Sequence, residues 1–232
     1  VWVNGPGTGL LVTDMIVRDT MADGINLHGG WERVTIERSS FRNQGDDSIA
    51  LWSDTHADAG NTIRDNLIQL PILANGIAIY GGRDNTVTGN LVADTVSNGG
   101  GIHVGNRFDR TVPLAGTTLV DSNTVVRCGS LESGWGFANG AIWFYALNEN
   151  MDGNVTVTNT AIVDAPYAAL MVVAGHPATS VSNLHLRNVT VDRAGTFALV
   201  LKAAGSLSAR DVTLGSSAFQ RIEDCGSKFA LA

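Results

Sequence analysis

The chain has 232 residues, 44 % of them hydrophobic, and its 22 acidic and 15 basic residues give a formal net charge of −7. This composition supports a buried core, which excludes wholesale disorder, and the apolar runs fall short of the ~18 residues that a membrane-spanning helix needs. An acidic chain without a basic stripe also argues against nucleic acid as a partner.

The length suits a single all-β domain, and we expect one domain over residues 1–232. The chain opens at Val1 with neither Met nor a signal-like apolar stretch. We therefore expect it to be a piece of a longer precursor.

The two cysteines, Cys128 and Cys225, provide neither a disulfide framework nor metal-ligand spacing. We expect two unpaired thiols. The alternative is a bridge that fastens the C-terminal tail, which requires the tail to double back because the two positions lie several repeats apart.

Short apolar alternations recur along the whole chain. One set follows Gly or a small polar residue and covers 23–28, 47–52, 75–80, 100–105, 140–145, 168–173 and 197–202. A second set usually carries Asn or Asp inside the pattern and covers 11–17, 62–68, 86–92, 118–125, 155–163, 184–191 and 207–214. Period-two alternation rich in β-branched residues is typical of strands, and no stretch has the 3.6-residue stripe of a helix.

The spacing of the first set predicts a solenoid. Most of its steps are 24–29 residues long, and two or three strands in each unit indicate a right-handed parallel β-helix of about seven turns. A β-propeller is the rival fold, but its blades repeat at ~40–50 residues. Polar residues between strands are expected to stack into hydrogen-bonded ladders, with Asn66, Asn90, Asn123 and Asn188 as the candidates.

One step of the repeat is longer than the others. Ile102 and Ile142 are 40 residues apart, which places an insertion at roughly 106–117 or 129–140. Long loops on a solenoid usually belong to its working face.

Three carboxylates gather where the first two of these strands begin. Aligning the turns on Ile25 and Ile49 puts Asp23 and Asp47 at the same position in adjacent turns, with Asp46 beside Asp47. Parallel strands lie ~4.8 Å apart, so at least one of these carboxyls should have a raised pKa. A raised pKa suits a general acid, and splayed side chains one turn apart can meet the ~6.5–9.5 Å separation of an inverting glycosidase. The alternatives are a solvated turn or a calcium site.

Aromatic and polar side chains follow the same register on the outward face. Trp52, Tyr80, Trp143 and Tyr145 would form an exposed strip suited to stacking on sugar rings; the alternative is that they pack beneath loops. The residues expected to bind substrate are His28, Trp52, Asp54, Asn75, Tyr80, His103, Asn106, Arg107 and Trp143. His28 and His103 have a purely structural alternative, and Arg107 has the alternative of a salt bridge within its loop.

The segments 23–30, 45–54, 70–82 and 99–107, with 113–117 after them, resemble family 87 of the glycoside hydrolases. That family holds bacterial α-1,3-glucanases, also called mutanases, and mycodextranases. The resemblance runs in order from about Asp23 to Trp143. It implies a catalytic β-helix of the pectin-lyase-like type, within a long, secreted, multi-modular enzyme that acts outside the cell.

The resemblance also implies a catalytic triad acting by inversion, which matches Asp23, Asp46 and Asp47 residue by residue. Related polygalacturonases suggest the first of the adjacent pair as the acid. Asp46 would then protonate the glycosidic oxygen, while Asp23 and Asp47 activate water. The expected activity is endo-acting hydrolysis of α-1,3-glucan.

Several alternatives stay open. The substrate could be another polymer, such as dextran, nigeran or a pectic chain, although few cationic residues are available to hold a pectic one. A non-catalytic β-helix that binds carbohydrate explains the repeats and aromatics equally well. The mechanism requires no cofactor, and a structural calcium near Asp54 or Asp58 is an open alternative. We expect a monomer, with association through the solenoid ends as the alternative.

Overall fold

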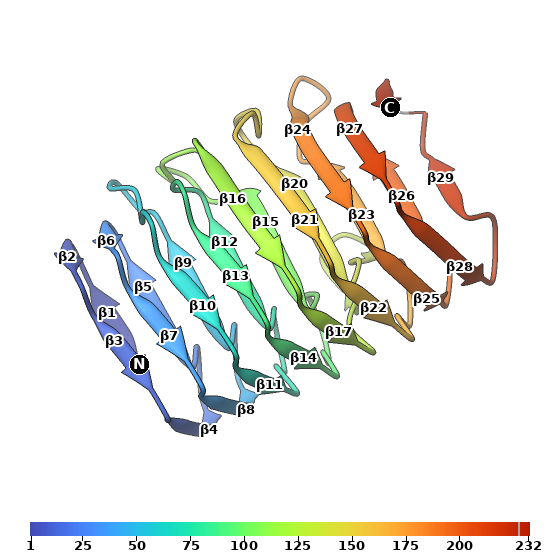
Figure 1. The fold of residues 1–232 in the computed structure, drawn as a ribbon. Coiled ribbons are helices and arrows are strands. Elements are labelled where there is room, and N and C mark those ends of the chain that lie inside the picture. The colour runs from blue at the N-terminus through green and yellow to red at the C-terminus, as the bar shows by residue number, and fades with distance from the viewer. Residues whose placement is uncertain (227) are drawn as a thin grey trace.

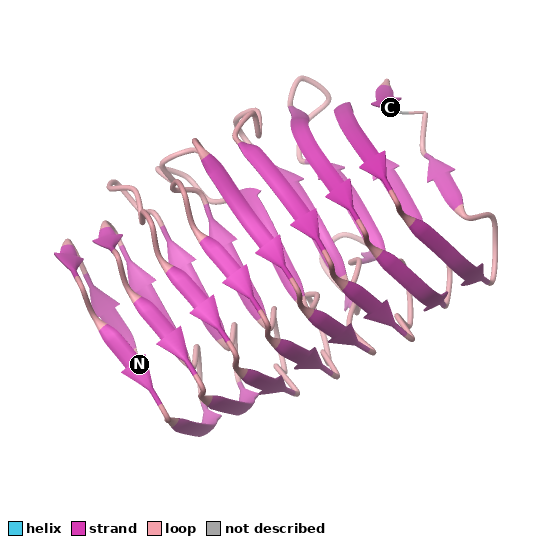
Figure 2. Ribbon diagram, viewed as in Figure 1, coloured by secondary structure: helices cyan, strands magenta, loops and turns pink. Residues whose placement is uncertain are grey.

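The computed structural model describes residues 1–226 and 228–232. These residues form strands, turns and bends but no helix (Figure 2), and hence no helix that could cross a membrane. The strands coil into a right-handed parallel β-helix of about eight turns, with the chain termini near opposite ends (Figure 1). The fold class predicted from the repeats is confirmed.

Three parallel sheets run the length of the solenoid. The first contains β1 (Trp2–Asn4), β5 (Ile25–His28), β9 (Ile49–Trp52), β12 (Ile77–Tyr80), β15 (Ile102–Asn106), β20 (Ile142–Ala146), β23 (Leu170–Ala174), β26 (Leu199–Lys202) and β29 (Ile222–Asp224). The second contains β3 (Leu11–Thr13), β7 (Thr35–Glu37), β10 (Thr62–Arg64), β13 (Thr86–Thr88), β16 (Thr117–Asp121), β21 (Asn154–Thr158), β24 (Ser180–Arg187), β27 (Ala204–Arg210) and β30 (Phe229–Leu231). The third contains β4 (Ile16–Thr20), β8 (Ser40–Gln44), β11 (Leu67–Gln69), β14 (Leu91–Ala93), β17 (Thr124–Val126), β22 (Ala161–Val163), β25 (Thr190–Ala194) and β28 (Thr213–Ser217).

The first-sheet alternation in the sequence covers seven of the nine described strands of this sheet and misses β1 and β29 at its two ends. At the N-terminal end, β1 covers only three residues and pairs with β5, yet Trp2 and the neighbouring Val1 are exposed. A short strand at the end of a solenoid has no second neighbour to bury its apolar face, so the repeat pattern fades there.

One column of the core takes one aliphatic residue from each of five successive turns. Ile25 faces Ile49, Ile49 faces Ile77, Ile77 faces Ile102, and Ile102 faces Ile142 across consecutive parallel strands. All five are buried. Burial of an aliphatic side chain contributes roughly 1.5–3 kcal/mol, so this column fixes the register of the first sheet and of everything attached to its outer face.

Polar ladders join the turns beside the core. The Asn66 backbone N–H and Nδ2 both donate to Asn90 Oδ1 at 3.0 Å, and Asn90 repeats this pattern with Asn123. The prediction was wrong for Asn188, which is exposed, has a φ of +49° and donates instead to Asn159. Asn188 lies one residue too early in its turn to point inward.

The sequence predicted one insertion at either of two places, and the structure has an insertion at both, within the same turn. One is the loop of residues 107–116 between β15 and β16. The other contains the small antiparallel hairpin of β18 (Leu131–Glu132) and β19 (Phe137–Ala138), between β17 and β20. The two insertions therefore flank the first sheet at opposite ends of its strands. Two further short strands, β2 (Gly7–Thr8) and β6 (Trp31–Glu32), pair with each other near the N-terminus. Cys128 and Cys225 are free thiols, as expected.

Candidate active site

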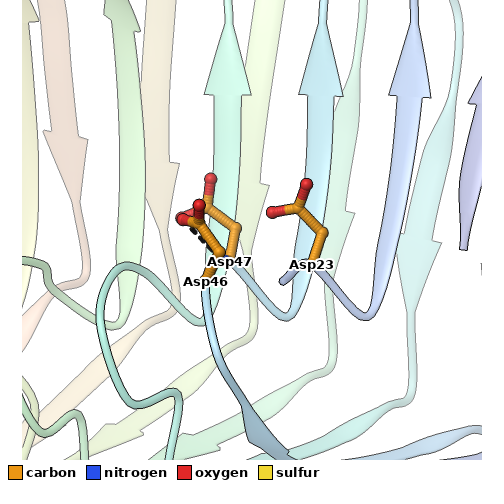
Figure 3. Close-up of side chains that lie close together, drawn as sticks. All are labelled: Asp23, Asp46 and Asp47. Carbon is orange, nitrogen blue, oxygen red and sulfur yellow. Dashed lines mark hydrogen bonds between the residues drawn. The ribbon is translucent and has the colours of Figure 1, made fainter. Parts of the chain in front are cut away.

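Three aspartates from two neighbouring turns converge where strands of the first sheet begin. Asp23 precedes β5, and Asp46 and Asp47 precede β9. Because β5 and β9 pair in parallel, Asp23 and Asp47 hold equivalent positions. One carboxylate oxygen of each residue lies within 4.8 Å of the others, and Figure 3 shows the side chains rising from the same edge of the sheet. Three acids this close can share and exchange a proton.

The surroundings of these acids oppose full ionisation. Burial, followed by the charge of Asp46, raises the pKa of Asp47 to about 7. Burial is also the largest cause of the raised pKa of Asp23, where the amide of Asn26 donates at 2.9 Å and offsets part of the effect. Carboxyls that interact this strongly titrate as a group, and at mildly acidic pH the group retains a proton.

Asp47 is held at both of its carboxylate oxygens. Its Oδ1 accepts from the backbone N–H and the Nδ2 of Asn75 at 2.8 and 2.9 Å, and its Oδ2 accepts from the Tyr80 hydroxyl at 2.8 Å. The Asn75 Oδ1 in turn accepts from the Gly100 backbone N–H and from Trp143 Nε1. Since both donors fix the amide oxygen, Nδ2 can only face Asp47.

The spacing of the three acids bears on the stereochemistry of the reaction. Inverting glycosidases place the acid and base carboxyls ~6.5–9.5 Å apart, whereas retaining enzymes use ~5–5.5 Å. One oxygen of each residue lies within 4.8 Å of the others, which does not fix the separation of whole carboxyl groups, so the splayed arrangement stays a prediction. Such a cluster could also face one cation, but acids alone do not specify a metal, and we assign none.

The outward aromatic residues do not form the exposed strip that was predicted. Tyr80, Trp143 and Tyr145 are buried, with Trp143 0 % exposed. The loop of residues 107–116 places Phe108 against Tyr80 with ring centroids 5.0 Å apart, and the hairpin places Trp135 5.8 Å from Trp143. The two insertions therefore cover the column that the register places outward, which is the alternative of packing beneath loops.

Four further residues expected to contact substrate are buried within the protein. Asn75 and His103 are 0 % exposed, Asp54 is buried, and Asn106 is buried and donates to the carbonyl of Asn150. The His103 ring stacks on the Trp143 ring with centroids 3.8 Å apart, and burial lowers the pKa of His103 well below its usual value. His103 is therefore neutral and packs against its neighbours, which is the structural role considered for it as the alternative.

The contacts described for Arg107 are with aromatic rings and not the loop salt bridge that was considered as the alternative. Its guanidinium carbon lies 5.2 Å from the ring centroid of Phe108, 5.4 Å from that of Trp135 and 5.7 Å from that of Trp143. These distances are those of cation–π contacts. Phe108 and Trp135 were missed from sequence because they lie in insertions, which have no strand register to align.

A second polar and aromatic group lies at the opposite ends of the same strands. His28 Nε2 and Arg110 both contact Asp54 Oδ2, at 3.1 and 3.2 Å. The ring centroid of the half-buried Trp52 lies 4.7 Å from that of His28 and 6.0 Å from that of the exposed Trp2. Of the predicted residues, His28 and Trp52 are the ones that keep partly accessible rings here.

The calcium considered near Asp54 or Asp58 stays an open alternative, because within the described part of the chain each residue has protein partners at only one of its carboxylate oxygens. Asp54 already pairs with two cationic or ionisable side chains. Asp58 is fully buried and its Oδ1 accepts from the backbone N–H groups of Gly30 and Trp31. Asp58 therefore anchors the neighbouring turn, and burial raises its pKa to about 7.

Comparisons with known proteins agree with this architecture. The family model described as "Alpha-1,3-glucanase catalytic domain D2" matches residues 8–230. The solved catalytic unit of a thermostable family 87 α-1,3-glucanase from Streptomyces thermodiastaticus strain HF3-3 has a TM-score of 0.89 and 35 % identity, over 99 % of this chain and 46 % of that one. The Agl-KA catalytic domain has a TM-score of 0.84 and 24 % identity, over 100 % and 44 %.

A variant catalytic domain of a family 87 α-1,3-glucanase, solved with tetrasaccharides, has a TM-score of 0.87 and 22 % identity, over 100 % of this chain and 47 % of that one. No curated protein sequence matches. The chain spans about half the length of the solved structures it matches. The match of the family model over nearly the whole chain places this protein in the α-1,3-glucanase catalytic domain family, glycoside hydrolase family 87.

Proposed function

We propose that this chain hydrolyses α-1,3-glucosidic bonds in glucan, acting within the polymer and outside the cell. The observation that carries the proposal is the cluster of Asp23, Asp46 and Asp47 at the start of adjacent strands, in a chain of this family. Structures of family 87 relatives hold nigerose and tetrasaccharides. Three of those structures carry aspartate-to-alanine substitutions separated by 23 residues and then by one, which are the separations of the three aspartates here.

The proposed roles follow from access and hydrogen bonding. Asp46 is partly exposed, and its Oδ1 accepts only the neighbouring Asp47 backbone N–H among the contacts described. It can therefore give a proton to the glycosidic oxygen as the bond from C1 to that oxygen breaks. Water attacks C1, and its proton passes to Asp23 or Asp47. The sugar that leaves carries the proton of Asp46, and transfer from Asp23 or Asp47 returns the cluster to its starting state.

The pKa of Asp47 and its hydrogen bonds point to different roles. A carboxyl whose pKa is about 7 would hold its proton, as a general acid does. The geometry decides against that role, because three donors point at its two oxygens and stabilise the ionised form. A proton on Asp46 would also remove the charge that is the second-largest cause of the raised pKa of Asp47. Protonation of Asp46 therefore favours the ionised form of Asp47.

Inversion needs one carboxyl as acid and one as base, and retention needs one as acid and one as nucleophile. We propose inversion, with Asp46 carrying the proton while Asp23 and Asp47 hold the attacking water. Nuclear magnetic resonance of the first product formed tests it: inversion of an α-linkage releases the β-anomer, and initial release of the α-anomer would establish retention.

The role of Asp46 is tested with a substrate that needs no acid. An Asp46→Asn variant should lose about 10²–10⁴-fold in hydrolysis of α-1,3-glucan, the usual worth of a general acid. It should keep most of its activity on an α-glucosyl fluoride built on the same sugar, since fluoride leaves without protonation. Asp23→Asn is the matched control, and it should be impaired on both substrates. Equal losses of Asp46→Asn on both would reject the assignment.

A further inference from the structure

Behind the three acids lies a buried network that the sequence had assigned to substrate. It runs from His103 through Trp143 and Asn75 to Asp47, and ends at Tyr80 on the other carboxylate oxygen. Every member is buried. None can therefore serve as an exposed platform for a sugar ring, and the network needs another explanation.

The contacts show how the network acts on Asp47. Tyr80 is an O–H donor, and burial together with the charge of Asp47 raises its pKa well above the usual value, so the hydroxyl keeps its proton. Trp143 Nε1 is a donor at any pH and fixes the Asn75 amide at 2.8 Å. Both donors thus favour the ionised form of a carboxyl that burial would otherwise protonate.

We propose that Tyr80 and Trp143 are positioning residues of the active site, which hold the Asp47 carboxylate ionised and oriented between Asp23 and the solenoid interior. Tyr80 does so directly, and Trp143 does so through the Asn75 amide. The proposal deepens the proposed function, because it gives the buried aromatic residues a part in the same reaction.

The other charges around Asp47 do not substitute for these donors. Asp46 and Asp23 face it and oppose its ionisation. His103 is neutral because burial and the Arg107 charge lower its pKa. The charge of Arg107 lowers the pKa of the Tyr80 hydroxyl, but it is not one of the main contributions to the pKa of Asp47. Within the described residues, stabilisation of the Asp47 anion rests on Asn75 and Tyr80.

The test is a carboxyl titration by nuclear magnetic resonance in protein labelled with ¹³C-aspartate, with the Asp47 signal identified by its loss in Asp47→Asn. Tyr80→Phe keeps the ring and removes the hydroxyl. It should raise the midpoint of Asp47 by about one to two pH units, the equivalent of one hydrogen bond to a charged group. Trp143→Phe should raise it by less, since Asn75 keeps its bond from Gly100.

Tyr145→Phe is the matched control. Tyr145 is buried two strands further along, at the position equivalent to Tyr80, and contacts the rings of Trp135 and Trp143. It should leave the Asp47 midpoint unchanged. An unchanged midpoint in Tyr80→Phe would overturn the proposal, and so would an equal rise in Tyr145→Phe.

Activity separates this inference from the proposed function. If Asp47 helps to activate water, the acidic limb of the kcat/KM profile on α-1,3-glucan oligosaccharides should move upward in Tyr80→Phe by the same amount as the titration midpoint. A midpoint that moves while the limb stays would retain the network and reject Asp47 as a base. A wild-type chain that cleaves no glucan would reject the proposed function, while the titration still decides the network.

Discussion

The Asn ladder makes a quantitative prediction about what joins the turns. The Asn90 side chain accepts two hydrogen bonds from Asn66 and donates to the carbonyls of Ile63 and Thr88 and to Asn123 Oδ1, all within 3.0–3.1 Å. Asn90→Ala strands the buried Asn66 backbone N–H, which costs about 1–3 kcal/mol, and removes further bonds worth about 1 kcal/mol each. We therefore expect a loss of about 3–5 kcal/mol in the free energy of unfolding.

Equilibrium urea unfolding followed by circular dichroism measures this loss. Asn188→Gly is the control, because Asn188 is exposed, lies outside the ladder, and has a φ of +49° that glycine accepts without strain. It should cost less than about 1 kcal/mol. If Asn90→Ala costs no more than this control, the ladder does not hold the turns together and the reasoning is refuted.

Three further predictions concern other parts of the molecule. Asp58 has a folded-state pKa of about 7 against 3.8 for the free group, so the folded state binds more protons and stability falls as pH rises between these values. Asp58→Asn should reduce that fall by about 2–3 kcal/mol, measured as the free energy of unfolding at pH 4.5 and 7.5. The control Asp65→Asn, at an exposed position, should leave the fall unchanged. Ile77→Ala should cost about 2–5 kcal/mol in urea unfolding because Ile77 is fully buried between turns, and a cost below 1 kcal/mol would contradict the stacked core. Arg107→Ala should raise KM on glucan oligosaccharides several-fold with a smaller change in kcat, since its cation joins the rings of the two insertions. A fall in kcat alone would contradict a role of Arg107 in substrate binding.

Much of the fold could be predicted because a solenoid repeats its physical constraint in every turn. The aliphatic residues at Ile25, Ile49 and Ile77 recur at a spacing that only one register satisfies, and that register also places Asp23 beside Asp47. Asn188 shows the limit of pattern matching. The residue type suits the ladder, but a shift of one position turns the side chain outward.

The surroundings of the acids could not be predicted, because they depend on segments without a repeat. Strand alternation puts Tyr80 and Trp143 on the outer face, and nothing in their own strands reveals that the two insertions fold back over that face. The bond from the Tyr80 hydroxyl to Asp47 joins residues 33 positions apart and requires the side chain to lean along its strand. Phe108 and Trp135, which close the cover, lie in loops where alternation gives no direction.

The measurement that tests the central claim most directly is the release of reducing ends from α-1,3-glucan by the wild-type chain and by Asp46→Asn. The account predicts release by the wild type and a loss of about 10²–10⁴-fold in the variant, with circular dichroism showing that the variant keeps its β-helix. A variant that is folded and retains near wild-type release would contradict the catalytic role of the cluster, and a wild-type chain that binds glucan without cleaving it would contradict the proposed activity.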